Sequence, residues 1–315
     1  MERSSGLALS LAALAFTLTT LGSSRDARAW CRTTTTQDFV GSDAMPCDDA
    51  GKPLFWSSRC VGFSVQRDGS YAQSIDLALA RSIALASFSQ WANALCPADV
   101  DHCTGDTGKH PSISIADVGP VSCNKPEYNQ TSGNANVIMF RDSNWDHPDP
   151  EVTLALTTVT FSPDTGEIYD ADMEINSDPK INQLTTGDDH VVYDLQSIMT
   201  HESGHFLGMA HTQPANTTAT MYYRYKTGVT FMRHLSPDDM CGICAAYDPN
   251  RTTVCDPTPR RGLALSCQGA DAPDTKKGCH CGVVGGDDSF LVDRCAMGFG
   301  ALAFVLGALR RRRRR

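Results

Sequence analysis

The chain has 315 residues, of which 41% are hydrophobic, so it is long enough to bury one sizeable core, and its composition excludes a fibrous or wholly disordered protein. The formal net charge is -9, and both ends are basic, so the body between residues 30 and 289 is more acidic than the whole chain. Such a surface would repel a polyanion, so no nucleic acid partner is expected.

Residues 1–29 have the features of a secretory signal peptide. Arg3 marks a short basic start, residues 7–21 are apolar or small, and Ala27-Arg28-Ala29 forms a small-x-small cleavage site. A transmembrane anchor is the alternative, but the apolar run is shorter than the roughly 20 residues that a membrane span needs. We therefore expect an exported protein whose mature chain begins at Trp30.

All thirteen cysteines lie beyond this cleavage site, where an oxidising environment favours disulfides. Ten of them lie in the body of the chain, an even number that fits full pairing. Cys96 and Cys103 bracket a short loop and are the best candidates for one local pair. Cys241-Gly-Ile-Cys244 is compatible with a redox or metal pair, but two structural half-cystines are the better interpretation in an exported protein.

The first half of the mature chain has mostly the patterns of strands. Residues 30–55 are polar and are expected to form an extended arm. An alternating pattern predicts a first strand over residues 60–66, and apolar residues at helical spacing predict one long amphipathic helix over residues 71–95. Further strands are expected at residues 112–116, 136–140, 152–161 and 167–175.

Two more helices are expected in the second half. One covers residues 194–207, with Asp194 near its start. Residues 212–233 lack periodicity and are expected to form a loop. The last helix begins with Ser236 as its cap and Pro237 in its first turn, and it reaches about Tyr247. Because strands mostly precede the last helices, the fold class is α+β.

The segment from His201 to His211 has the spacing of a catalytic zinc site. His201 and His205 lie four residues apart on a predicted helix, so both imidazoles point to the same side. Gly208 can adopt a left-handed conformation that ends the helix and lets the chain bring His211 to the same point. Three neutral imidazoles and one open position are what catalytic zinc requires. Glu202 is placed to take the proton of a water molecule in that position.

Chance is a poor explanation for this motif. With this composition, the full pattern would arise by accident in roughly one such chain in a hundred thousand. An exposed polar helix face with scattered histidines is therefore the weaker interpretation. A non-catalytic surface binding module that keeps zinc for structure is the competing function. A structural zinc site would normally have a fourth protein ligand, and no candidate is evident beside the three histidines.

The eleven-residue segment, His-Glu-Ser-Gly-His-Phe-Leu-Gly-Met-Ala-His, resembles the zinc signature of the metzincin peptidases. The resemblance implies a zinc-dependent endopeptidase for protein or peptide substrates, with Glu202 as general base and one catalytic Zn²⁺ on the three histidines. It also implies a twisted mixed β-sheet with a long helix, an active-site helix and a C-terminal helix. Metzincins carry a methionine turn beneath the metal, and Thr220-Met221-Tyr222-Tyr223 follows at a suitable distance. A buried apolar Met221 with no such role is the alternative.

Among metzincins, the matrixins are the most similar group, and residues 56–248 are expected to form the catalytic domain. Residues 235–243, Leu-Ser-Pro-Asp-Asp-Met-Cys-Gly-Ile, resemble the matrixin final helix, and residues 166–174 resemble the strand before the active-site helix. Residues 154–158 stand where matrixins keep the edge strand that aligns the substrate. The resemblance implies that an extended peptide pairs with residues 152–161.

The chain departs from matrixins at their accessory metal sites. Tyr169 stands where they have a histidine, and we find no neighbouring histidine cluster for a second, structural zinc. Ala171 replaces a common calcium-binding acid, although Asp172 and Glu174 remain. Calcium bound through Asp170, Asp172 or Glu174 is one hypothesis, and solvent-facing strand carboxylates are an equal alternative. Disulfides would then take the place of metal ions as cross-links.

The methionine turn also departs from the matrixin pattern. Matrixins usually carry Pro two residues after the Met, where this chain has Tyr223, as astacins and serralysins do. In those relatives the tyrosine approaches the zinc and can stabilise the oxyanion, so the resemblance implies that Tyr223 is catalytic. An exposed loop tyrosine is the alternative. We find no matrixin-type cysteine-switch segment, so the control of latency is left open.

The carboxyl-terminal part differs in composition from the rest. Residues 249–278 are rich in Pro, Gly, Thr and charge and are expected to form a linker. Residues 279–315 hold Cys279-His-Cys281, an apolar run and six arginines, an order that resembles the MYXO-CTERM sorting tails of myxobacterial surface proteins. The resemblance implies a tail that lies in the membrane before processing, and an extracellular or outer-membrane-anchored protein. A basic nucleic-acid-binding tail is the alternative, and export argues against it. No feature indicates an oligomeric state.

Overall fold

A computed structural model describes residues 30–36, 47, 50–213, 215–269, 277–281 and 284–285. The predicted signal peptide and most of the predicted tail lie outside the described residues. In the parts of the chain that are described, no helix is long and apolar enough to span a bilayer.

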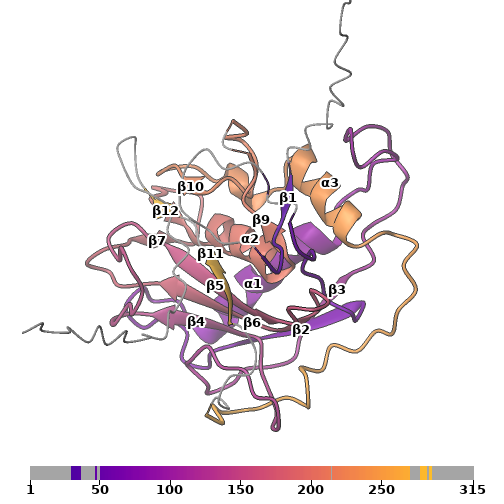
Figure 1. Ribbon diagram of the computed structural model, residues 1–315. Helices are drawn as coiled ribbons and strands as arrows, with labels where there is room; N and C mark the ends of the chain where they lie inside the picture. The colour runs from indigo at the N-terminus through magenta and orange to yellow at the C-terminus, as the bar shows by residue number, and fades with distance from the viewer. Residues whose placement is uncertain are drawn as a thin grey trace, which may run out of the picture.

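A mixed six-stranded sheet forms one layer of the protein (Figure 1). Its strand order is β11-β5-β6-β4-β2-β3. The strands β2, β3, β4 and β6 run parallel to one another, whereas β5 is antiparallel to both of its neighbours, β6 and β11. The bounds are β2 (Cys60–Val65), β3 (Ser114–Asp117), β4 (Val137–Arg141), β5 (Ala155–Phe161), β6 (Ile168–Asn176) and β11 (Lys277–Cys281). The five strands predicted from alternation are thus confirmed, and so is the α+β class with a twisted mixed sheet.

Three α-helices complete the domain: α1 (Leu77–Ala92), α2 (Leu195–Phe206) and α3 (Pro237–Ala246). The first begins six residues later than the apolar periodicity predicts, because Ser70 and Ile75 pair in a tight antiparallel bridge and Asp76 then caps the helix. The start of α3 is as predicted. Ser236 and Asp239 form a reciprocal capping box there, and Pro237 occupies the first helical position.

Short strands join distant parts of the chain. In the amino-terminal arm, β1 (Cys31–Arg32) pairs with β9 (Met209–Ala210), and β7 (Leu184–Thr185) pairs with β8 (Tyr193–Asp194). The prediction of an unstructured loop over residues 212–233 was incomplete. That stretch contains β10 (Arg224–Tyr225), which pairs with β12 (Val284–Gly285), and the 3₁₀ helix η1 (Phe231–Arg233). Segments this short have too few residues to show a periodicity.

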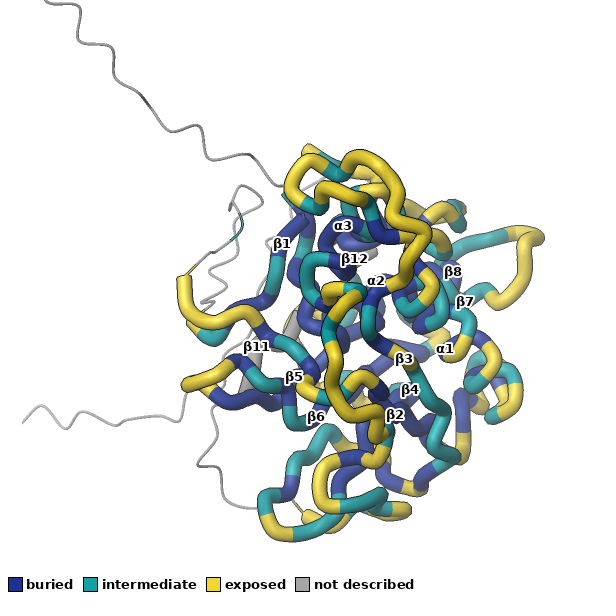
Figure 2. Tube along the Cα trace, turned by 90° about the vertical axis from the view of Figure 1, so that its right-hand side faces the viewer, coloured by how far each residue is buried: buried dark blue, intermediate teal, exposed yellow. Residues whose placement is uncertain are grey.

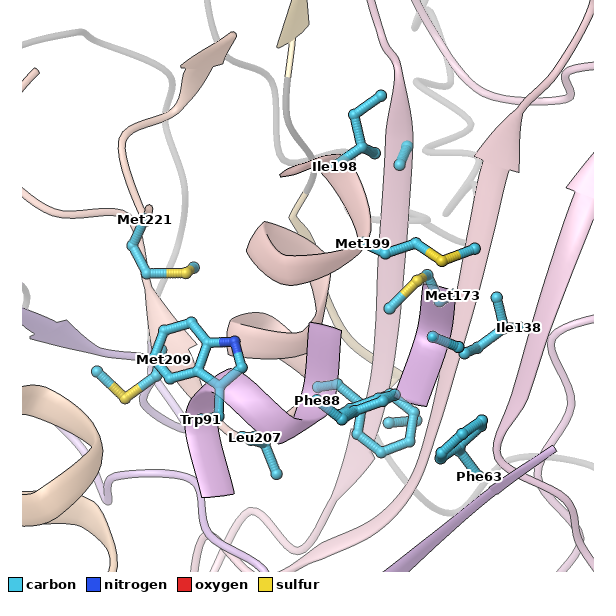
Figure 3. Close-up of a cluster of buried hydrophobic side chains, with 14 of the residues drawn as sticks. Phe63, Phe88, Trp91, Ile138, Met173, Ile198, Met199, Leu207, Met209 and Met221 are labelled. Atoms are coloured by element: carbon cyan, nitrogen blue, oxygen red, sulfur yellow. The ribbon is translucent and has the colours of Figure 1, made fainter. Parts of the chain in front are cut away.

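The main core lies between the sheet and the helices α1 and α2 (Figure 3). Phe88 of α1 is at its centre, with its ring centroid 5.0 Å from those of both Phe63 and Phe206. Every residue of α2 except Gln196 is buried, so this helix runs through the interior rather than along the surface (Figure 2). A helix in that position can hold polar side chains only where each has a partner, which makes its two histidines and its glutamate unusual.

Five disulfides link the described residues, and the predicted Cys96–Cys103 pair is wrong. Cys96 bonds to Cys244 and Cys103 to Cys241. Cys241 and Cys244 lie three residues apart on α3, so their side chains lie on the same face of the helix. Each bonds to one of the two cysteines of the loop that follows α1. The prediction that the Cys241–Cys244 motif supplies structural half-cystines is therefore confirmed.

Residues 249–269, which belong to the predicted linker, are bonded to the sheet. Cys255 is bonded to Cys60 in β2, and Cys267 is bonded to Cys123 in the loop before β4. The segment also pairs by backbone with Asn134 through Leu263. This part of the chain therefore covers the sheet instead of leading away from it.

Candidate active site

The three predicted histidine ligands converge on one point. His201 and His205 lie on α2, and His211 follows β9. Their Nε2 atoms are 3.1 Å apart for His201 and His205, and 3.2 Å apart for each of the two pairs that include His211. The three form one of the groups of described residues that could hold a metal ion.

The donor set fits a zinc ion. Zinc–nitrogen bonds of about 2.0–2.1 Å at tetrahedral angles would place ligand nitrogens about 3.3 Å apart, close to the distances seen here. The Nδ1 atoms of His201 and His205 donate to the backbone carbonyls of Thr220 and Met209, at 2.6 and 2.9 Å. A neutral ring that donates from Nδ1 has only a lone pair at Nε2, so these nitrogens cannot bond to each other and need a cation between them.

Burial favours the neutral, ligating form of these rings. Desolvation lowers the pKa of His201 to about 3 and lowers the pKa of His205 well below its ordinary value, and nearby His211 adds to both shifts. Neither ring therefore carries a proton on the metal-facing nitrogen at neutral pH.

Glu202 is completely buried beside this group. Its Oε2 accepts a hydrogen bond of 2.6 Å from the hydroxyl of Thr157, which is itself fully buried in β5. The sequence analysis missed Thr157, because the contact joins residues 45 positions apart and no local pattern marks it. Strand β5 therefore contacts the predicted general base directly.

Two glycines in the motif allow close packing. Gly208 has φ of +87°, which confirms the predicted left-handed turn at the end of α2. Gly204 lies within the helix, where a Cβ would meet the sulfur of Met221 at 2.3 Å and the ring of Trp91 at 2.7 Å. Met221 thus packs directly against the histidine-bearing helix, as expected of a methionine turn (Figure 3). An isolated glycine in a helical pattern was the signal for this approach.

The methionine turn is fixed from the other side by Asp239 in the first turn of α3. The two carboxylate oxygens of Asp239 accept the backbone amides of Thr220 and Met221, at 2.7 and 3.0 Å. The carbonyl of Thr220 in turn accepts from His201. The capping residue of α3 therefore holds the orientation of a candidate metal ligand through one backbone segment.

Tyr223 is buried, with 7% of its surface exposed, so it is not an exposed loop side chain. Its ring centroid lies 6.1 Å from that of His211. The guanidinium of Arg224 lies over the ring of Tyr223, 5.0 Å from its centroid. The tyrosine thus lies next to the histidine group, and its catalytic role stays a prediction.

Asp170, Asp172 and Glu174 on β6 are buried. The alternative hypothesis, that these carboxylates face solvent instead of binding calcium, is therefore wrong. Glu174 bonds to Arg141 and His147, at 2.6 and 2.9 Å. Burial alone would raise the pKa of Glu174, but the hydrogen bond from His147 and the charge of Arg141 outweigh it and lower the pKa. The guanidinium of Arg141 and the ring of His147 therefore already bind this carboxylate.

Asp170 and Asp172 form a different kind of pair. Burial first, and then the charge of Asp172, raise the pKa of Asp170 well above its ordinary value, while burial raises the pKa of Asp172 to about 8. Asp172 accepts the backbone amides of Glu127 and Val137, whereas Asp170 Oδ1 has no hydrogen-bond partner among the described residues. Because both pKa values are higher in the folded state than in the unfolded chain, the pair favours folding at acid pH, and this contribution is lost as the pH rises toward 8.

Asp170→Asn is expected to raise the melting temperature at pH 8 by about 2–4 °C, roughly 1 kcal/mol for a domain of this size, and to flatten its decline between pH 5 and 8. The amide is neutral in the folded and the unfolded state, so folding at pH 8 no longer requires a buried carboxyl to take up a proton, and the amide can still donate to Asp172. Thermal scans without added calcium would measure this, with exposed Asp146→Asn as the matched control. A lower melting temperature that depends on calcium would instead show that a bound cation holds the pair ionised.

Tyr169 packs against one aromatic and one cationic side chain. Its ring stacks on Tyr128 at a centroid distance of 5.9 Å, and the guanidinium of Arg260 lies 3.9 Å from its centroid. Arg260 belongs to the segment that the disulfides attach to the sheet. Aromatic and cation–π packing thus occupies the position where the resemblance would place a histidine.

Comparison with known proteins agrees with this geometry. Residues 130–248 match the family model described as Matrixin. A stretch of 133 residues is 35% identical to human matrix metalloproteinase-20, which covers 40% of this chain. The aligned part spans only 25% of that relative's length. The matched part of this chain, which contains the three histidines and Glu202, is thus similar to the matrixin family.

Proposed function

We propose that this chain is a zinc-dependent endopeptidase that hydrolyses peptide bonds outside the cytoplasm. The observation that carries the proposal is the convergence of three Nε2 atoms on one point, next to the buried carboxylate of Glu202. The matrixin match over residues 130–248 supports the same conclusion. Zinc analysis together with a casein-type assay on the wild type and Glu202→Ala is the test.

The residues of the site would divide the work as follows. The three histidines would hold a zinc ion, which when bound would supply a Lewis acid for polarising the scissile carbonyl and lowering the pKa of a water molecule. Glu202 accepts the proton of that water and delivers it to the leaving amine. Thr157 holds the carboxylate of Glu202 in place through its hydroxyl. Tyr223 donates a hydrogen bond to the developing oxyanion.

Thr157→Val is expected to lower kcat about tenfold while KM changes by less than about twofold. The valine side chain has nearly the same shape but lacks the hydroxyl, so the carboxylate loses its positioning hydrogen bond. Thr157→Ser, which keeps the hydroxyl, should restore most of the rate, and Thr160→Val on the same strand is the matched control. Equal losses in the Val and Ser variants would indicate a packing role instead.

Tyr223→Phe is expected to lower kcat by about 10- to 100-fold with little change in KM, because the hydroxyl would act only on charge that develops in the transition state. Steady-state kinetics on a peptide substrate would separate the two constants. Tyr222→Phe is the neighbouring control, since that ring packs against Tyr223. An unchanged rate would remove Tyr223 from the mechanism.

A non-catalytic binding module that contains zinc is the competing function. Such a site would be closed by a fourth protein ligand, and the group found among the described residues contains only His201, His205 and His211. Zinc bound equally by the wild type and Glu202→Ala, without proteolysis in either, would favour the binding module.

Export and surface display are part of the proposal. The five disulfides support an oxidising compartment. The signal peptide over residues 1–29 and the sorting tail over residues 279–315 are inferred from their sequence patterns. Calcium at Asp170 and Asp172 is a further hypothesis, and the pH-dependent melting of Asp170→Asn tests it.

A further inference from the structure

The two edges of strand β5 have different pairing partners. One edge pairs with β6 over seven residue pairs, from Ala155 to Phe161. The middle of the strand contacts the predicted general base, through the hydroxyl of Thr157 and the carboxylate of Glu202. The other edge presents backbone N–H and C=O groups that can bind an extended peptide as an added strand. A peptide paired there would lie beside the catalytic group.

The chain's own C-terminal segment pairs with this second edge. Strand β11 runs antiparallel to β5, with Lys277 opposite Thr160, His280 opposite Thr158 and Cys281 opposite Thr157. The backbone of residue 281 is thus opposite the residue that holds Glu202. Figure 1 shows β11, drawn in yellow, alongside β5.

The C-terminal part of the chain also pairs with the strand that follows Tyr223. Strand β12 runs parallel to β10, with Val284 opposite Arg224 and Gly285 opposite Tyr225. Arg224 directly follows Tyr223, whose ring lies beside His211. Cα atoms three residues apart can be separated by at most about 11 Å, so residue 281, opposite β5, and residue 284, opposite β10, lie within that distance of each other.

From these two pairings we infer that β11 and β12 form a built-in competitor for the substrate. The inference rests on the proposed function. Backbone groups of β5 that are bonded to β11 cannot bond to an incoming peptide at the same time, so the segment must leave before the peptide can pair. Cys267, bonded to Cys123, holds the chain to the sheet shortly before β11. A competitor tethered by a short connection acts at an effective concentration on the order of millimolar.

The test uses the full chain with a recognition site for a sequence-specific protease placed within residues 270–276. Cleavage followed by gel filtration should lower KM for an extended peptide about tenfold or more. The wild type treated with the same protease is the control. Loss of the cleaved segment would be confirmed by mass spectrometry. KM and kcat that stay unchanged after its complete removal would overturn the inference.

A substitution in β11 tests the same inference without cleavage of the chain. His280→Pro removes a backbone N–H from β11 and disfavours pairing, so it should also lower KM. His280→Ala keeps the backbone hydrogen bonds and is the matched control. An equal KM in the two variants would count against the strand as competitor.

Binding measurements separate this inference from the proposed function. A fluorescent peptide should bind the zinc-loaded Glu202→Ala chain more tightly after cleavage than before. If that happens and the cleaved chain that keeps Glu202 hydrolyses nothing, the inferred competitor is supported and the peptidase proposal fails. If the chain that carries the protease site and Glu202 hydrolyses the peptide equally well before and after cleavage, the inferred competitor is wrong and the peptidase proposal is supported.

Discussion

Glu202→Ala is expected to lower kcat on a peptide substrate by about a thousandfold or more and to leave the zinc content unchanged. The buried carboxylate of Glu202 is the proposed group for the proton transfer, and such transfers contribute roughly 10² to 10⁴ in rate. Glu202 does not belong to the histidine group that would hold the metal, so metal binding should survive. Kinetics on a fluorogenic peptide and elemental analysis of the same sample measure both quantities.

Two controls make the result specific. Glu151→Gln changes an exposed carboxylate that is not part of the proposed site, so it should leave kcat unchanged. Glu202→Gln keeps the side-chain shape and can still accept the hydrogen bond from Thr157, so a loss as large as that of Glu202→Ala would point to proton transfer rather than packing. Retention of more than about a tenth of wild-type kcat in Glu202→Ala would exclude Glu202 as general base.

His211→Ala is expected to weaken zinc binding by about a hundredfold or more and to abolish proteolysis. Loss of groups that merely orient a metal ligand costs 10- to 100-fold in affinity, so loss of the ligand itself should cost at least as much. The variant should also melt at a lower temperature than the wild type when zinc is present, because metal that binds the folded state stabilises it. Competition with a chromophoric chelator and thermal scans would measure the two effects.

His110→Ala is the matched control, because this histidine is exposed and lies outside the metal-binding group. It should keep wild-type zinc affinity and activity. Wild-type zinc affinity in His211→Ala would mean that another residue completes the site, and the three-histidine assignment would then be wrong.

The sheet face opposite the helices is stabilised by several interactions that need no metal. The ion pair of Arg141 with Glu174, the stacking of Tyr169 on Tyr128 and the disulfide from Cys123 to Cys267 all lie in this region. The ion pair joins β4 to β6, the stacked rings join β6 to the loop before β4, and the disulfide joins that loop to residue 267. Of these, the disulfide attaches the segment after residue 249, and the guanidinium of Arg260 over the ring of Tyr169 adds a second contact, although the composition of that segment resembles a linker.

The local spacing of residues in the sequence was enough to predict the candidate metal site, the cap of the last helix and the strands. The four-residue interval from His201 to His205 and the glycine at 208 predict the candidate metal site, because helical geometry and left-handed backbone conformations are properties of short segments. The cap at Ser236 and the alternating strands are of the same kind. The family resemblance came from these local patterns, and the fold class followed from their order.

Only the tertiary structure decided which distant residues meet. The hydroxyl of Thr157 on Glu202, the disulfides of Cys96 and Cys103 with α3, and the pairing of β11 with β5 all join residues that are far apart in the chain. A disulfide partner or a buried hydrogen bond depends on how whole elements pack, and an edge strand accepts any extended segment that reaches it. Sequence spacing carries no information about such contacts, because packing brings together positions that share no local period.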